Sequence, residues 1–244
     1  MKQTICMLLV FFTLNIQAQK KEKLALPLYI KVGFNLNNVI TTNNGSSSKQ
    51  GSALNANLGV ETVVPIIRYK IINRLSFNPS LQYNPTSYKP STNFNTTTYV
   101  QIQNVRVNYL TVELPICYNI NWKSMFQNSE NKKGISPLFV GIGPYFSYAL
   151  SGKYKTLGIA NNQSVYGQQK MSFGNGVNDN RTRFDAGYVI KAGMDFMRFR
   201  LVLQKNIGLV NVYPKDRIVN GNSIVTRGLY FTLSYTFSKF KNYY

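Results

Sequence analysis

The sequence predicts an all-β protein: an eight-stranded antiparallel up-and-down transmembrane β-barrel that follows a cleaved signal peptide. Three observations predict this fold. Apolar and polar residues alternate with period two in eight segments of the chain. These segments run to about 9–13 residues, close to the roughly 9–11 that a tilted strand needs to cross a bilayer. Their apolar faces are nearly free of charge, as a surface in contact with lipid must be.

The chain begins with the three parts of a secretory signal peptide. Lys2 gives a basic start, residues 5–14 form an apolar run, and Ala18 supplies a small residue at the expected cleavage point. The run is much shorter than the roughly 20 residues of a membrane-spanning helix, so we expect export rather than anchoring. The expected organisation is a signal peptide at 1–18, a short periplasmic segment at 19–27, a barrel at 28–240 and a C-terminal tail at 241–244.

The eight alternating segments each place aliphatic or aromatic side chains on one face and Gly, Asn, Ser or isolated charges on the other. In the first, Leu28 and Ile30 share a face opposite Tyr29 and Lys31. A soluble lipocalin-like barrel or a sandwich also alternates, but it turns its apolar faces into a shared core. The apolar faces carry no charge except Lys205, and this near absence of charge favours the membrane barrel. The expected strands are 28–36, 54–64, 75–83, 110–120, 138–150, 184–196, 199–209 and 229–237.

The connections between these strands differ in length in a regular way. Long polar segments follow every odd-numbered strand, at 39–53, 84–109, 151–183 and 210–228. Shorter ones follow the second, fourth and sixth, at 65–74, 121–137 and 197–198. Because outer-membrane barrels have short periplasmic turns and long external loops, we expect the long segments to lie outside the cell. A two-residue turn at 197–198 sets Phe196 opposite Phe199 and Asp195 opposite Arg200.

Short motifs within the strands add a resemblance to a known family. They lie at 31–35 (KVGFN), 75–83 (LSFNPSLQY), 108–116 (NYLTVELPI), 141–145 (GIGPY), 185–188 (DAGY) and 233–237 (LSYTF). With the Ala18-Gln19 junction, they resemble the small eight-stranded, PorT-like outer-membrane β-barrels of the Bacteroidetes. The resemblance implies a barrel in the cell outer membrane. A resemblance to PorT itself implies a part in type IX protein secretion.

The polar faces carry charges that a barrel would enclose. An unpaired buried charge costs several kcal/mol, so these residues are expected to form an ion-pair network in the lumen. Eight strands leave an interior just wide enough for side chains to fill, so a narrow channel is the less favoured alternative. The expected network consists of Lys31, Glu61, Glu113, Asp185, Lys191, Asp195 and Arg200.

Composition excludes several kinds of catalytic site. The chain has no His, which rules out Ser-His-Asp and Cys-His sites, a His general base and His-containing metal sites. A pair drawn from Glu61, Glu113, Asp185 and Asp195 could perform glycoside chemistry, but ion pairing is the favoured interpretation. With Cys6 in the signal peptide, Cys117 has no disulfide partner. We therefore expect no catalytic residue, no cofactor and no metal.

The formal net charge of +20 suggests contact with anions. Export separates the protein from nucleic acid, so outer-membrane lipid and lipopolysaccharide are the expected partners of a monomeric barrel. The segment 151–183 is the best candidate for contact with a protein or glycan, against the alternative of a solvated loop without a ligand. Its candidate contact residues are Lys153, Tyr154, Lys155, Tyr166, Lys170, Arg181 and Arg183. The function hypotheses are a structural or interaction barrel, an accessory part of a secretion or transport machine, and a narrow channel.

Overall fold

A computed structural model describes residues 26–43, 46–66, 75–89, 100–120, 138–160, 163–196, 198–218 and 221–237. The predicted signal peptide at 1–18, most of the predicted segment at 19–27, the predicted turn at 121–137 and the predicted tail at 241–244 lie outside the described residues.

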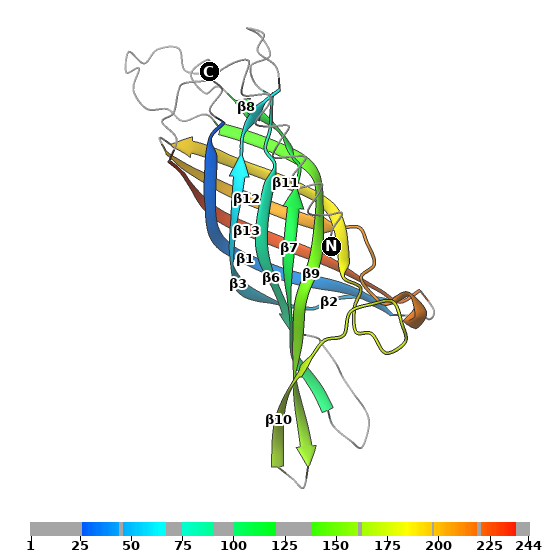
Figure 1. Cartoon of the computed structure of the whole chain (residues 1–244). Coiled ribbons are helices and arrows are strands. Elements are labelled where there is room, and N and C mark those ends of the chain that lie inside the picture. The colour runs from blue at the N-terminus through cyan, green and yellow to red at the C-terminus, as the bar shows by residue number, and fades with distance from the viewer. Residues whose placement is uncertain are drawn as a thin grey trace, which may run out of the picture.

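Eight antiparallel strands form a closed ring, as the alternation predicts (Figure 1). Each pairs with its neighbour along the chain, and the first strand pairs with the last to close the barrel, with Tyr29 opposite Thr236. No helix among the described residues is long and apolar enough to cross a membrane. The ring strands are β1 (Leu28–Asn43), β3 (Gly51–Thr62), β6 (Ser80–Lys89), β7 (Val100–Glu113), β9 (Leu138–Ala160), β11 (Phe184–Phe196), β12 (Phe199–Gly208) and β13 (Ser223–Thr236).

Three ring strands continue past a short interruption. β4 (Val64–Pro65), β5 (Leu75–Phe77) and β8 (Ile116–Ile120) extend β3, β6 and β7 in unchanged register. Two of the interruptions fall at Pro79 and Pro115, because proline has no N–H to donate to the ladder. Each predicted strand at 54–64, 75–83 and 110–120 is therefore one strand with a break.

The expectation that the long external segments are loops is wrong in part. β1, β6, β7, β9 and β13 all run on into them, and β2 (Ser46–Lys49) and β10 (Gln163–Lys170) lie entirely within them. Among the described residues of these segments, only 210–228 contains a helix, the short 3-10 helix η2 (Lys215–Arg217). Polar residues form strands here because the edge of a neighbouring strand offers unpaired backbone N–H and C=O groups. β9 and β10 form a hairpin that projects beyond the ring (Figure 1).

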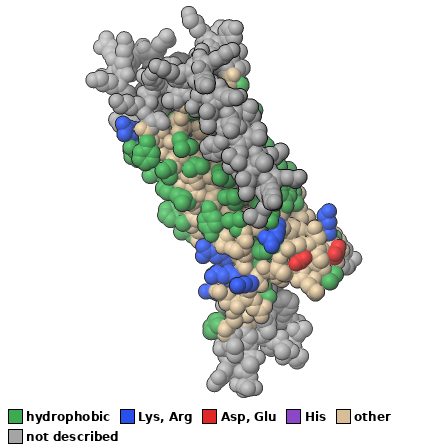
Figure 2. All heavy atoms as spheres, viewed as in Figure 1, with side chains coloured by type: hydrophobic (Ala, Val, Ile, Leu, Met, Phe, Trp, Pro, Cys, Tyr) green, Lys and Arg blue, Asp and Glu red, His purple; other side chains and the backbone are tan. Residues whose placement is uncertain are grey.

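The outward face of the ring carries the apolar residues, and they form a band around the barrel (Figure 2). On β9 this face runs from Val140 to Leu150 and includes Ile142, which is 59% exposed. Ten residues span about 33 Å along a strand, or about 25 Å in height at the usual tilt, which matches the apolar band of outer-membrane barrels. The band is therefore as tall as the hydrocarbon that it would contact.

The β11–β12 hairpin confirms the register predicted from the turn at 197–198. Phe196 pairs with Phe199 and Asp195 pairs with Arg200. The inward face also explains the glycines on these strands. A Cβ at Gly193 would lie 2.5 Å from the ring of Phe139, so only glycine lets the aromatic side chain fill the lumen there.

Candidate functional site

Six charged side chains meet inside the barrel, in the half that holds the start of β1 and the β11–β12 turn. We call this cluster the ionic floor. It contains three cations and three carboxylates, so its formal charge is zero, and every member is at most 3% exposed. Its residues are Lys31, Glu61, Glu113, Lys191, Asp195 and Arg200.

Glu61 is the centre of the ionic floor. One carboxylate oxygen lies 3.0 Å from Lys191 Nζ and 3.4 Å from Lys31 Nζ, and the other accepts a 2.7 Å hydrogen bond from Arg200. Lys31 has no hydrogen bond of good geometry among the described residues and is held by charge alone. One carboxylate thus forms ion pairs with cations from three different strands.

Arg200 links the ionic floor to aromatic residues. Its Nε and one terminal nitrogen donate to the two oxygens of Asp195 at 2.6 and 2.8 Å. The guanidinium lies 4.7 Å from the ring centre of Tyr29 and 4.6 Å from that of Phe139. A planar cation held in a fork and stacked on two rings has little freedom to move. This side chain therefore blocks the lumen as a fixed group.

Glu113 joins the ionic floor mainly through neutral donors. It accepts hydrogen bonds from Ser80 at 2.9 Å, from Gln82, and from Gln204 at 2.5 Å, while Lys31 lies 3.8 Å away. Gln82 and Gln204 are not among the predicted network residues, although both lie on the polar faces of predicted strands. Side-chain alternation alone could have identified them.

Asp185 does not belong to this cluster, and its predicted place in the network is wrong. It lies ten residues before Asp195 on β11, about 33 Å away along an extended strand. There it accepts a hydrogen bond from Thr226 and lines a small cavity of about 20 Å³ together with Tyr109 and Asn84. The other Asp185 oxygen, the Tyr109 hydroxyl and both Asn84 amide atoms have no partner among the described residues.

An apolar cluster lies next to this cavity and shares Tyr109 with it. We call it the apolar lid; it packs against Met171 and Phe173 from the segment that follows β10. That segment is fixed by backbone hydrogen bonds, among them Met171 to Gly152 and Asn180 to Ser172. The buried members of the apolar lid are Val39, Tyr88, Val105, Val107, Tyr109 and Ala149.

Arg181 belongs to this same segment, but its side chain is only 1% exposed. Its predicted role as a surface contact is therefore wrong. Its guanidinium stands 5.8 Å from the ring centre of Tyr109. Burial lowers the pKa of Arg181, but Tyr109, Tyr88 and Asp185 outweigh it and hold that pKa above its ordinary value. These neighbours lie beside the guanidinium without full hydrogen-bond geometry. The sequence pattern does not show this burial, because the segment is held against the barrel by contacts with residues distant in the sequence.

The other candidate contact residues are distributed over two faces of the β9–β10 hairpin and its base. Four of them are exposed on one face: Lys153, Lys155, Tyr166 and Lys170. Lys153 pairs with Lys170, and Tyr166 lies two residues beyond Gln168, the partner of Lys155. Tyr154 lies on the opposite face.

Tyr154 donates a 2.5 Å hydrogen bond to Gln169 and packs against the apolar lid. Arg183 is exposed at the rim of the barrel, with its guanidinium 5.8 Å from the ring centre of Tyr148. The hairpin therefore presents cations and one tyrosine on a single accessible face.

Neither the ionic floor nor the cavity has the layout of a familiar reaction centre. The carboxylates of Glu61 and Asp195 form ion pairs with cations. The carboxylate of Glu113 accepts hydrogen bonds from amide and hydroxyl groups. Within the described ranges there is no group of three or more His, Cys, Asp or Glu side chains that could hold a metal ion. The described residues give no clear catalytic assignment.

Comparisons with solved structures give similarities of low identity. The attachment invasion locus protein Ail of Yersinia pestis is 13% identical, with 87% of this chain and 99% of that chain covered and a TM-score of 0.38. Neisserial surface protein A is 12% identical, covering 86% and 97%, with a TM-score of 0.35. The outer membrane protease OmpT of Escherichia coli is 12% identical, covering 88% and 99%, with a TM-score of 0.32.

No curated protein matches the chain in sequence. A family model described as an outer membrane protein beta-barrel domain matches residues 17–213. That match covers most of the chain and agrees with the closed ring of eight strands and its outward apolar band. The chain therefore belongs to the outer membrane protein beta-barrel domain family.

Proposed function

We propose that this barrel is exported to the outer membrane and acts there as a surface-binding module, with the β9–β10 hairpin as its binding element and an anionic glycan as its ligand. The observation that carries the proposal is the projection of the hairpin beyond the ring (Figure 1). β9 has 23 residues, about twice the 9–11 that a crossing requires. The far part of β9, paired with the eight residues of β10, therefore extends beyond the part of the strand that a crossing needs.

The height of the hairpin separates it from the lipid surface. Tyr166 pairs with Leu157, seven residues beyond Leu150, the last residue of the outward apolar series on β9. Seven residues of extended chain reach about 23 Å, well past the level of a typical headgroup layer. The far part of the hairpin is therefore placed to meet molecules outside the membrane.

The chemistry of this part suits a polyanion with a sugar backbone. Tyr166 is 74% exposed and supplies an aromatic face on which a sugar ring can stack. Lys155 and Gln168 form a cross-strand pair next to it and supply a charge and an amide. A cation beside an exposed ring and a hydrogen-bonding amide is a combination that recognises sulfated or carboxylated sugars.

The lumen supports binding rather than conduction. The ionic floor occupies one half of the barrel and the apolar lid closes the other. An ion crossing this lumen would have to displace Arg200 from Asp195 and then pass the lid residues Val107 and Tyr109. We therefore place the activity outside the barrel, and no catalytic step is part of the proposal.

The test uses the full chain in nanodiscs of neutral lipid, with dextran sulfate as the probe and unmodified dextran as its uncharged counterpart. The double variant Lys155→Gln, Tyr166→Ala should bind dextran sulfate about tenfold more weakly than the wild type, because a charge and a stacking face are lost. The matched control is Lys215→Gln, Val177→Ala, which removes one exposed cation and one exposed apolar side chain elsewhere. Equal loss in both variants, or equal binding of both dextrans, would contradict the proposal.

The resemblance of the strand motifs to PorT-like barrels supports a second candidate, an accessory role in type IX secretion. Deletion of the whole protein should then block secretion, and the Lys155→Gln, Tyr166→Ala variant should restore it. A secretion defect that only the wild-type hairpin repairs would instead favour a protein partner at the hairpin.

A further inference from the structure

The outward surface at the base of the hairpin carries a row of cations on three neighbouring strands. Arg106 on β7 pairs with Lys153 on β9, and Lys153 pairs in turn with Lys170 on β10. All three side chains are exposed. Two further exposed cations lie two residues along the strands from this level: Lys89 on β6, beyond the Ser87 that pairs with Arg106, and Lys155 on β9. We call the first three the cation row.

A β-bulge places the cation row on the lipid-facing side of the barrel. Tyr109 pairs with Ala149 but Asn108 pairs with Ser151, which leaves Leu150 as an extra residue on β9. The extra residue shifts the alternation, so the outward series that includes Tyr148 and Leu150 continues with Ser151 and Lys153. Without the bulge, Gly152 and Tyr154 would face outward and Lys153 would face the lid. The backbone thus changes one continuous face from apolar to cationic.

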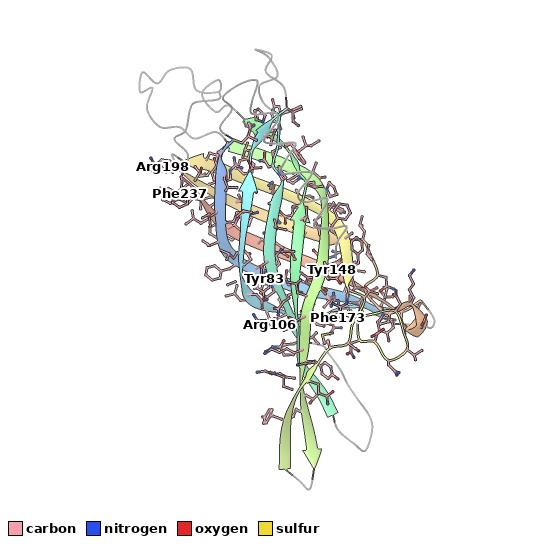
Figure 3. All side chains as sticks on the ribbon, in the orientation of Figure 1. Tyr83, Arg106, Tyr148, Phe173, Arg198 and Phe237 are labelled. Atoms are coloured by element: carbon pink, nitrogen blue, oxygen red, sulfur yellow. The ribbon has the colours of Figure 1, made fainter. Side chains whose placement is uncertain are left out.

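The level of the cation row is that of the membrane surface. Lys153 lies three residues beyond Leu150, about 10 Å along the strand, and Arg106 lies four residues beyond the outward Leu110, about 13 Å. Figure 2 shows cations gathered next to the apolar band, and Figure 3 places Arg106 beside the base of the hairpin. Arg183 marks the same rim, with its guanidinium 5.8 Å from the ring centre of Tyr148. Because the cation row begins where the apolar band ends, its side chains lie at the level of the lipid headgroups.

Nothing in the described part of the protein neutralises this row. Of the eight acidic residues in the sequence, Glu61, Glu113, Asp185 and Asp195 are buried in the lumen. Asp179 and Asp216 lie in the segments beside the barrel mouth, and Glu22 and Glu130 lie outside the described residues. No described ion pair includes a member of the cation row. Directly opposed like charges on neighbouring strands repel each other, so a bound external anion would stabilise the row.

We propose that the cation row binds the phosphates of the outer-leaflet glycolipid, lipopolysaccharide. Cross-strand neighbours stand about 5 Å apart, so one phosphate can contact two of the cations and a doubly phosphorylated lipid can contact all three. A phosphate carries nearly two charges and three acceptor oxygens, which matches one Arg fork and adjacent Lys ammonium groups. The site lies below Tyr166 and does not depend on what the far part of the hairpin binds. It does require that the apolar band faces lipid with the hairpin outside.

The test compares the full-length triple variant Arg106→Gln, Lys153→Gln, Lys170→Gln with a charge-matched control, Lys49→Gln, Arg198→Gln, Lys215→Gln. The control removes three exposed cations that lie away from the row. Both are folded in neutral detergent and titrated with lipopolysaccharide, dephosphorylated lipopolysaccharide and inorganic pyrophosphate. Each cation near an anionic surface contributes roughly fivefold, so the triple variant should lose on the order of a hundredfold in affinity for lipopolysaccharide while the control stays within a few-fold.

Three further readouts decide the proposal. Dephosphorylated lipopolysaccharide should bind the wild type as weakly as intact lipopolysaccharide binds the triple variant. In lipid-free detergent the triple variant should unfold at the same temperature as the wild type or a higher one, since repulsion is relieved. The Lys155→Gln, Tyr166→Ala variant should keep its affinity for lipopolysaccharide, which separates this site from the proposed glycan site. Equal loss in the charge-matched control, or pyrophosphate binding as tight as that of lipopolysaccharide, would overturn the lipid site.

Discussion

Removing the central carboxylate of the ionic floor should destabilise the barrel strongly. Glu61→Gln keeps the size of the side chain but leaves three buried cations facing two carboxylates. Glu61 lies 2.7 Å from Arg200, 3.0 Å from Lys191 and 3.4 Å from Lys31. Breaking a buried ion pair by removing one partner costs about 3–5 kcal/mol, because the remaining charge stays buried.

The assay is urea unfolding of the purified barrel in detergent micelles, followed by the mobility difference between heated and unheated samples on a gel. At an m value of about 2 kcal/mol/M, the midpoint of Glu61→Gln should fall by about 2 M. Asp216→Asn is the control, since it makes the same chemical change at an exposed carboxylate in the η2 turn.

A second substitution tests the mechanism. Lys191→Met in the Glu61→Gln background leaves two cations and two carboxylates in the cluster, so it should regain part of the lost stability. The reasoning is refuted if Glu61→Gln and Asp216→Asn agree within about 0.5 kcal/mol, or if Lys191→Met adds its full cost to that of Glu61→Gln.

Three other predictions concern the lumen, the lipid face and conduction. Glu113→Ala should cost about 2–4 kcal/mol in the same unfolding assay because it deprives buried amide donors of their acceptor, while Lys49→Ala on exposed β2 should cost almost nothing; equal midpoints would count against the buried network. Ile142→Lys should reduce stability in lipid by about 2–4 kcal/mol, measured as folding yield in bilayers, whereas Tyr166→Lys on the hairpin should leave the yield unchanged. In planar bilayers the wild type should show no steady conductance, and a large constant current would show that the ionic floor and apolar lid leave a path open.

Period-two alternation was sufficient to predict all eight ring strands and the hairpin register at Asp195 and Arg200. It succeeded because one face of every strand contacts lipid, so a shift of one residue would expose charge to that face. The same signal placed Lys31, Glu61, Glu113, Lys191 and Arg200 inside the barrel.

The signal fails where the strands leave the lipid. From Ser151 onward β9 has no apolar face to repeat, so its continuation into a hairpin has no sequence signature. Asp185 was grouped with the ionic floor because alternation gives the face of a residue and not its height along the strand. Arg181 was placed at the surface because a lone cation in a polar segment carries no sign of the fold-back that buries it.

The most direct test of the whole account is the lipid exposure of single positions on β13 and the hairpin in one experiment. Cysteines are introduced one at a time at Leu229 to Ser234 and at Tyr166, in a Cys117→Ala background, labelled with a fluorophore and reconstituted in nanodiscs. A barrel whose apolar band faces lipid should show quenching by lipid-attached spin labels at Leu229, Phe231 and Leu233 and none at Tyr230, Thr232 and Ser234. Tyr166 should be quenched only by a water-soluble agent. Uniform access of the water-soluble agent along β13, or lipid quenching at Tyr166, would contradict the account.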